Sequence, residues 1–155
     1  MIDVKGQVGL TTHSMRSEKS AESHVVCLVD DDPLVLNSLR HLLASDGIAA
    51  RSFDKTETFL AHIAVHRVEL AVLDIRMAGM SGLEVQAYLS SICCQTRVII
   101  LTGSEGPDDE RNAMQAGAIA FFTKPFDDEQ FLATVHGALA QAKASQELRS
   151  RSDRR

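Results

Sequence analysis

The sequence lacks tryptophan, has a single tyrosine, and contains no long apolar run. No segment approaches the roughly 18–20 consecutive apolar residues that a membrane-spanning helix needs, so we expect no membrane association. Residues 1–23 also lack the apolar core of a secretory signal peptide. These absences predict a cytoplasmic protein.

Cysteine is scarce, and its pattern excludes two classes of small protein. Cys27, Cys93 and Cys94 are odd in number and do not have the spacing of a metal-binding motif. A scaffold held together by disulfides is therefore not expected, and a reducing compartment fits. The six histidines are interpreted as surface or packing residues rather than metal ligands.

Charge divides the chain into three segments. Residues 1–23 carry three acidic and three basic residues without hydrophobic periodicity, which predicts a flexible leader. Residues 24–140 carry 16 acidic and 8 basic residues, so this central domain is a poor candidate for direct binding of nucleic acid. Residues 141–155 carry two acidic and five basic residues. This basic C-terminal extension could contact a phosphate backbone, although a solvated helix end or a linker is the commoner interpretation.

The apolar pattern of residues 24–140 predicts one domain in which five strands alternate with five helices. The strands are expected at residues 24–29, 48–53, 70–73, 98–101 and 119–122. Apolar residues at helical spacing follow each strand, and Asp54 is a candidate cap for the second helix. Short apolar strands between amphipathic helices indicate an α/β fold with a doubly wound parallel sheet. Such sheets bind ligands beyond the carboxyl ends of their strands.

Polar residues follow four of the five expected strands. They are Asp30, Asp31 and Asp32 after the first strand, Asp74 after the third, Thr102 after the fourth and Lys124 with Pro125 after the fifth. Crowded carboxylates raise one another's pKa, and a divalent cation removes this conflict. Oxygen ligands without nearby histidine or cysteine favour Mg²⁺. The alternative is that the three consecutive aspartates cap the helix that follows them.

This set of residue types suits phosphoryl transfer. A carboxylate beside Mg²⁺ can attack phosphorus and form an aspartyl phosphate. The charge that develops on the phosphoryl oxygens needs a cation and a hydroxyl donor, and Lys124 and Thr102 are of the right types.

Five short motifs, in this order, carry a resemblance to a known family. They are Leu28-Val29-Asp30-Asp31-Asp32, Leu73-Asp74-Ile75-Arg76-Met77, Gly79-Met80-Ser81-Gly82-Leu83-Glu84, Ile100-Leu101-Thr102-Gly103 and Phe121-Phe122-Thr123-Lys124-Pro125-Phe126. Residues 24–140 resemble the receiver domain of bacterial two-component response regulators, and they are most similar to the FixJ-like branch. The resemblance implies the CheY-like, flavodoxin-like form of the doubly wound fold.

The resemblance implies which residues hold the metal and accept the phosphoryl group. Asp74 is expected to be the phosphoacceptor. Asp30 and Asp31 are expected to hold Mg²⁺ together with Asp74 and the backbone carbonyl of Arg76. Asp32 matches a position that is often acidic but is not a regular ligand.

The remaining roles implied by the resemblance concern response to the phosphoryl group. Thr102 is expected to bond a phosphoryl oxygen, and Lys124 to pair with the phosphoryl group or, before phosphorylation, with Asp74. The Lys124–Pro125 peptide bond is expected to be cis. Thr102 and Phe121 match the two positions of the conformational switch.

Variable positions around the site complete the comparison with the family. Arg76 and Ser104 match positions that tune the lifetime of the phosphate. Ala78 stands where proline is common. Gly79 and Gly82 are expected to serve the geometry of the turn after Asp74.

The resemblance predicts a phosphorylation-controlled switch rather than an enzyme acting on a separate substrate. A sensor histidine kinase or a phosphotransfer protein is expected to supply the phosphoryl group. The surface of the helix ending near residue 116, the strand at 119–122 and the last helix is then expected to form a homodimer or bind a partner. One alternative is that the chain is the receiver portion of a longer FixJ-like DNA-binding regulator. Others are a phosphate-independent interaction module and a phosphatase, against which Arg76 stands where such enzymes carry a second acid.

Overall fold

The computed structural model describes residues 25–92, 95–104 and 106–154. The expected leader, together with Cys93 and Cys94, therefore lies outside the described residues. Five strands form one sheet: β1 (Val25–Val29), β2 (Ala49–Phe53), β3 (Leu70–Leu73), β4 (Arg97–Thr102) and β5 (Ala120–Thr123). Their order is β2-β1-β3-β4-β5, and every neighbouring pair is parallel.

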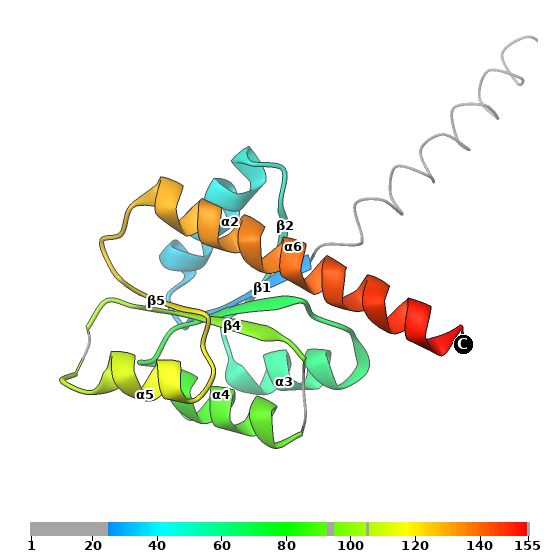
Figure 1. Ribbon diagram of the computed structural model, residues 1–155. Coiled ribbons are helices and arrows are strands. Elements are labelled where there is room, and N and C mark those ends of the chain that lie inside the picture. Colours follow the sequence, from blue (N-terminus) through cyan, green and yellow to red (C-terminus); the bar gives the residue numbers. More distant parts are fainter. Residues whose placement is uncertain (1–24, 93–94, 105, 155) are drawn as a thin grey trace, which may run out of the picture.

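Helices cover both faces of this sheet (Figure 1). The helices are α2 (Pro33–Ser45), α3 (Thr56–Val65), α4 (Gly82–Ser91), α5 (Asp109–Gln115) and α6 (Asp128–Asp153). Helices α2 and α6 pack on one face, and α3, α4 and α5 pack on the other. This arrangement confirms the predicted five-stranded, doubly wound parallel sheet in a single domain.

Two hydrophobic layers fill the space between the sheet and its helices, because successive strand residues point to opposite faces. Leu28 and Val72 belong to the layer under α2 and α6, whereas Cys27 and Leu73 belong to the layer under α3, α4 and α5. Burial raises the pKa of the Cys27 thiol to about 11. Cys27 therefore packs as a small neutral side chain in the core.

The helix starts are set by local side-chain chemistry. Asp32 is the N-cap of α2 and accepts a hydrogen bond of 2.9 Å from the backbone N–H of Leu34. One of the three consecutive aspartates is thus a cap, as the structural alternative supposes. The expected cap at Asp54 is wrong. Helix α3 begins one residue later, after an extended Lys55 that makes no side-chain capping bond.

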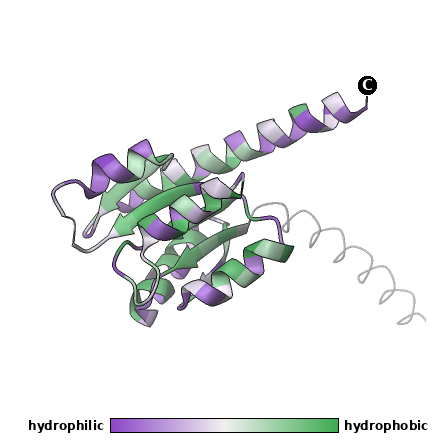
Figure 2. Cartoon of the chain, turned by 90° about the horizontal axis from the view of Figure 1, so that it is seen from below, coloured by the Kyte–Doolittle hydropathy of each residue, from purple (hydrophilic) through white to green (hydrophobic). Residues whose placement is uncertain are grey.

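Helix α6 is much longer than the sheet requires. Its 26 residues span about 39 Å, and its last turns extend past the rest of the domain (Figure 1). Its buried residues occur only in its first half, and the last of them is Ala142. The strands are largely hydrophobic, whereas the free end of α6 is largely hydrophilic (Figure 2). Within the part of the chain that the structure describes, no helix combines the length and apolar character needed to cross a bilayer.

Candidate functional site

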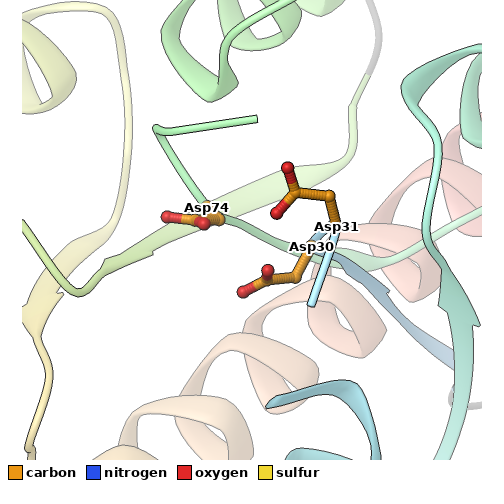
Figure 3. A group of neighbouring side chains, drawn as sticks. All are labelled: Asp30, Asp31 and Asp74. Atoms are coloured by element: carbon orange, nitrogen blue, oxygen red, sulfur yellow. The ribbon is translucent and has the colours of Figure 1, made fainter. Parts of the chain in front are cut away.

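Three carboxylates gather at the carboxyl edge of the sheet. Asp30 and Asp31 follow β1, Asp74 follows β3, and one carboxylate oxygen from each lies within 4.8 Å of the others (Figure 3). Asp30 and Asp74 are buried, with exposed fractions of 4% and 8%, whereas Asp31 is exposed. The parallel register brings β1 and β3 side by side, and so their ends meet. Asp32 is absent from this group because its side chain caps α2.

The environment of Asp74 disfavours its charged form. Burial raises the pKa of Asp74 above its usual value, and the carboxylate of Asp30 raises it further. Opposing contributions come from the Lys124 ammonium, the Arg76 backbone N–H and the Thr102 hydroxyl. Like charges at this distance are stable together only when a cation compensates them.

The donor set fits a hard divalent cation. The three grouped side chains all offer carboxylate oxygens, which Mg²⁺ and Ca²⁺ prefer, and no described histidine or cysteine belongs to the group. The backbone of Arg76 lies next to them, since its N–H is 3.4 Å from Oδ1 of Asp74. These residues could therefore hold a metal ion at the mouth of the site.

Lys124 reaches the acidic group from the end of β5. Its Nζ lies 3.1 Å from Oδ2 of Asp30, and the two side chains are 23% and 6% exposed. The expected pairing with Asp74 in the unphosphorylated state is thus replaced by a pairing with Asp30, the more deeply buried of the two carboxylates. The Lys124–Pro125 peptide bond is cis.

Thr102 ends β4 and is fully buried. Its hydroxyl donates a hydrogen bond of 3.0 Å to the carbonyl oxygen of Ser104 and accepts one of 3.3 Å from the Ser104 N–H. Phe121, on the neighbouring strand β5, is half-buried against the hydrophobic layer under α3, α4 and α5. The two expected switch residues therefore lie on adjacent strands, one buried and one partly open.

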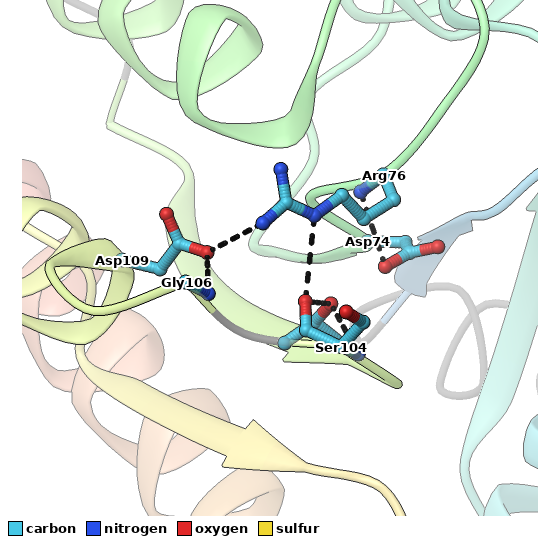
Figure 4. Close-up of polar contacts among 6 residues, drawn as sticks. Asp74, Arg76, Ser104, Gly106 and Asp109 are labelled. Atoms are coloured by element: carbon cyan, nitrogen blue, oxygen red, sulfur yellow. Dashed lines mark hydrogen bonds and ion pairs between the residues drawn. The ribbon is translucent and has the colours of Figure 1, made fainter.

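Arg76 crosses from the β3–α4 loop to the β4–α5 region (Figure 4). Its Nε donates to the Ser104 carbonyl oxygen at 3.4 Å, and its Nη2 lies 3.1 Å from Oδ2 of Asp109. The two positions expected to tune phosphate lifetime, Arg76 and Ser104, are thus bonded to each other. Asp109 is the residue that sequence reasoning missed, because it opens a helix instead of ending a strand.

The two glycines of the turn after Asp74 serve different purposes. Gly79 has a φ of +83°, a conformation that favours glycine. Gly82 is required by a close approach instead, since a Cβ there would lie 2.9 Å from the carbonyl carbon of Asp74 and closer still to its oxygen. Gly82 thereby lets α4 begin directly against the backbone of Asp74.

One pair of histidines departs from the expected scatter. His62 and His66 lie four residues apart, at α3 and its C-cap, with their rings stacked at a centroid distance of 4.3 Å. Arg51 Nη1 lies 3.4 Å from Nδ1 of His62, and burial, His66 and Arg51 all lower the pKa of His62. A guanidinium beside these rings opposes the binding of a metal cation.

Comparison with known proteins agrees with this architecture. The family model of the response regulator receiver domain matches residues 26–136. The response regulator protein TmoT of Ectopseudomonas mendocina is 34% identical over 142 residues, which cover 92% of this chain and 62% of TmoT. The transcriptional regulatory protein FixJ of Azorhizobium caulinodans is 37% identical over 122 residues, which cover 78% of this chain and 57% of FixJ. The chain thus spans little more than half the length of these relatives.

Solved structures give the same result. The response regulator StyR matches with a TM-score of 0.76 and 35% identity, covering 84% of this chain and 66% of that chain. The beryllofluoride-activated NtrC4 receiver domain, which was solved as a dimer, matches with a TM-score of 0.71 and 26% identity, covering 76% of this chain and 98% of its own. The chain therefore belongs to the response regulator receiver domains of two-component systems.

Proposed function

We propose that Asp74 accepts a phosphoryl group and that its phosphorylation switches the surface formed by α5, β5 and α6. The observation that carries the proposal is the position of Asp74. It is a buried carboxylate, with a raised pKa, between two further acids and within the influence of Lys124 and Thr102. Such an environment is characteristic of groups used in chemistry.

The transfer step would use the Asp74 carboxylate as the nucleophile. A new P–O bond forms to a carboxylate oxygen while the P–N bond to a donor histidine, or the P–O bond to acetyl phosphate, breaks. The bonding electron pair stays with the donor's leaving atom. Mg²⁺, held by Asp30, Asp31, Asp74 and the Arg76 backbone carbonyl, would supply positive charge against the phosphoryl oxygens.

The chain's own residues would bind and stabilise the transferred group. Lys124 Nζ, now 3.1 Å from Asp30, offers a charge-assisted hydrogen bond to a phosphoryl oxygen. The Thr102 hydroxyl, now donating to the Ser104 carbonyl, is the second donor. The domain catalyses only its own phosphorylation and dephosphorylation, so it acts as a switch.

The conformational response would start at Thr102. When its hydroxyl turns toward the phosphoryl group, it leaves the Ser104 carbonyl and opens space beside β5. The half-buried ring of Phe121 can then move inward, which alters the α5–β5–α6 surface. A two-state element biased by one charge event can then form a homodimer or bind a partner.

The donor is proposed to be a sensor histidine kinase or a phosphotransfer protein. An apolar groove lies next to the site, between α2 and the start of α6, and includes Leu34, Val35, Lys124 and Phe126. Leu34 is a large apolar residue that remains 74% exposed there. Because the groove shares Lys124 with the acidic site, a protein seated in it would bring a phosphohistidine close to Asp74. Leu34→Glu should slow transfer from such a protein while leaving transfer from acetyl phosphate unchanged.

Intact-mass measurement after incubation with acetyl phosphate and Mg²⁺ tests the proposal. Wild type should gain one phosphoryl group, and EDTA should abolish the gain. Asp74→Asn should gain none, whereas Asp32→Asn, which alters an acid of the same edge outside the group, should behave like wild type. A gain of equal size in Asp74→Asn would refute the assignment.

A further inference from the structure

Arg76 joins the phosphorylation site to the first residue of α5. Its backbone N–H lies beside Asp74, while its guanidinium turns away from that carboxylate toward Ser104 and Asp109 (Figure 4). The guanidinium is more than half exposed. A long, flexible and exposed side chain can change partners without disturbing the core.

Asp109 is arranged to receive this guanidinium. The Asp109 side chain is 16% exposed, and its Oδ2 accepts from both Arg76 Nη2 and the Gly106 N–H. A Cβ at Gly106 would lie 3.2 Å from Asp109 Oδ2 and 3.4 Å from Arg76 Nη2, so the backbone closes tightly over the pair. The neighbouring acid Asp108 has a different partner, Arg111. Asp109 is therefore the specific anionic partner of Arg76 in this conformation.

One carbonyl group connects this ion pair to the switch residue. The Ser104 carbonyl oxygen accepts both the Thr102 hydroxyl, at 3.0 Å, and Arg76 Nε, at 3.4 Å. Two donors that flank Asp74 are thus held away from it by the same acceptor. Whatever draws one donor toward Asp74 weakens the anchoring of the other.

We propose that Asp109 is a positioning residue that competes with the phosphoryl group on Asp74 for the Arg76 guanidinium. This inference rests on the proposed function. A phosphoryl group brings roughly two negative charges, against one on Asp109, so phosphorylation favours transfer of Arg76 toward Asp74. Asp109 stabilises the unphosphorylated conformation, and its release frees the first turn of α5. The pair thereby couples the site to one edge of the switching surface.

The test is the affinity for beryllofluoride, which binds a phosphoaccepting carboxylate as a stand-in for the phosphoryl group. Calorimetric titration in the presence of Mg²⁺ compares wild type with Asp109→Asn and Asp108→Asn. The second variant removes the same charge at the start of the same helix. We expect Asp109→Asn to bind about threefold more tightly than Asp108→Asn, the size of effect that an ion pair of this exposure supports. Equal affinities, or weaker binding by Asp109→Asn, would overturn the proposal.

A double-mutant cycle separates competition from a general structural effect. In an Arg76→Gln background, the Asp109→Asn substitution should no longer change the affinity, because its effect passes through Arg76. A gain that persists in this background would refute the mechanism. Asp109→Ser serves as a second variant should Asp109→Asn fold poorly, and thermal unfolding monitors both.

The two proposals fail in different ways. If wild type neither gains a phosphoryl group by intact mass nor binds beryllofluoride, the proposed function is wrong. If wild type does both, but Asp109→Asn cannot be distinguished from Asp108→Asn, only the role of Asp109 is wrong.

Discussion

The two edges of the sheet both carry polar residues, and they use them differently. At the amino edge, Thr96 donates to the Val68 carbonyl at 2.7 Å, the Arg97 N–H donates to the Glu69 carbonyl at 3.1 Å, and Arg97 also contacts Ser145 at 3.4 Å. These contacts join loops to neighbouring elements and satisfy backbone groups. The amino edge is therefore complete without any added group.

The carboxyl edge is electrostatically unbalanced. Three carboxylates lie within 4.8 Å, two of them are buried, and Lys124 is the described side chain that forms an ion pair with the group. The comparison teaches that polar character alone does not mark a functional site. Like charges buried together do, because they cost stability unless a cation or a reaction uses them. Substitutions at the two edges should accordingly differ in size and in sign.

The largest effect is expected at the backbone contact that closes the carboxyl edge. In Gly82→Ala the new Cβ would collide with the Asp74 carbonyl group, which is fixed backbone. We expect a loss of about 3 kcal/mol in the free energy of unfolding, measured in urea, the upper range for over-packing. Gly137→Ala is the matched control, because no atom lies within 4 Å of its Cβ position in α6. That variant should gain roughly 0.5–1 kcal/mol from helix propensity, and equal losses in the two variants would contradict the account.

Removal of the cation at the carboxyl edge should come next. Lys124→Met leaves the buried Asp30 carboxylate without its ion-pair partner. In EDTA we expect a loss of about 2 kcal/mol, smaller than for a fully buried pair because Lys124 is partly exposed. Lys124→Arg keeps the charge and should lose less. Added Mg²⁺ should restore part of the stability of Lys124→Met, and a failure to do so would argue against a cation site among the three acids.

Removal of a charge from the acidic group should stabilise the fold. Because the pKa of Asp74 is raised, the folded state holds this proton more tightly than the unfolded state. The stability contributed by Asp74 therefore falls as pH rises from the ordinary aspartate value of 3.8 through the raised value. At neutral pH in EDTA, Asp74→Asn should gain about 1 kcal/mol, the order of one buried polar group.

The pH dependence of that gain is the sharper test. Below the ordinary aspartate range both variants are neutral at position 74, so the difference in unfolding free energy should disappear. Asp32→Asn, whose side chain caps α2, should show little change, since asparagine caps helices as well as aspartate does. A gain for Asp74→Asn that did not depend on pH would point to packing instead of charge.

The smallest effect is expected at the amino edge. Arg97→Gln loses a contact of 3.4 Å to Ser145. The free energy of unfolding should change by less than about 0.5 kcal/mol, as for an ordinary surface substitution. Its stabilisation by Mg²⁺, followed by thermal unfolding, should equal that of wild type. A Mg²⁺ response that depended on Arg97 would remove the distinction between the two edges.

The strands and the residues at their ends could be predicted from the sequence because both depend on local patterns. A buried parallel strand is a short apolar run, and the first polar residue after it must lie at the carboxyl edge. Asp74 and Thr102 follow from this rule alone. The end of α6 did not, since its last turns pack against little and have no apolar periodicity.

The side-chain partners could not be predicted in the same way. Lys124 has several carboxylates within reach, and its pairing with Asp30 depends on distances that spacing does not encode. The Arg76–Asp109 pair joins residues 33 positions apart through two loops. Gly82 was expected to serve the turn, but its role is a close approach between α4 and the Asp74 backbone, which only the packing of the two elements reveals.

The most direct test of the central claim is the position of the phosphoryl group. After incubation with acetyl phosphate and Mg²⁺, borohydride reduction converts an aspartyl phosphate to homoserine, which peptide mass mapping can locate. The account predicts homoserine at position 74 and unmodified aspartate at positions 30 and 31. Homoserine at position 30 or 31, with Asp74 unmodified, would contradict it.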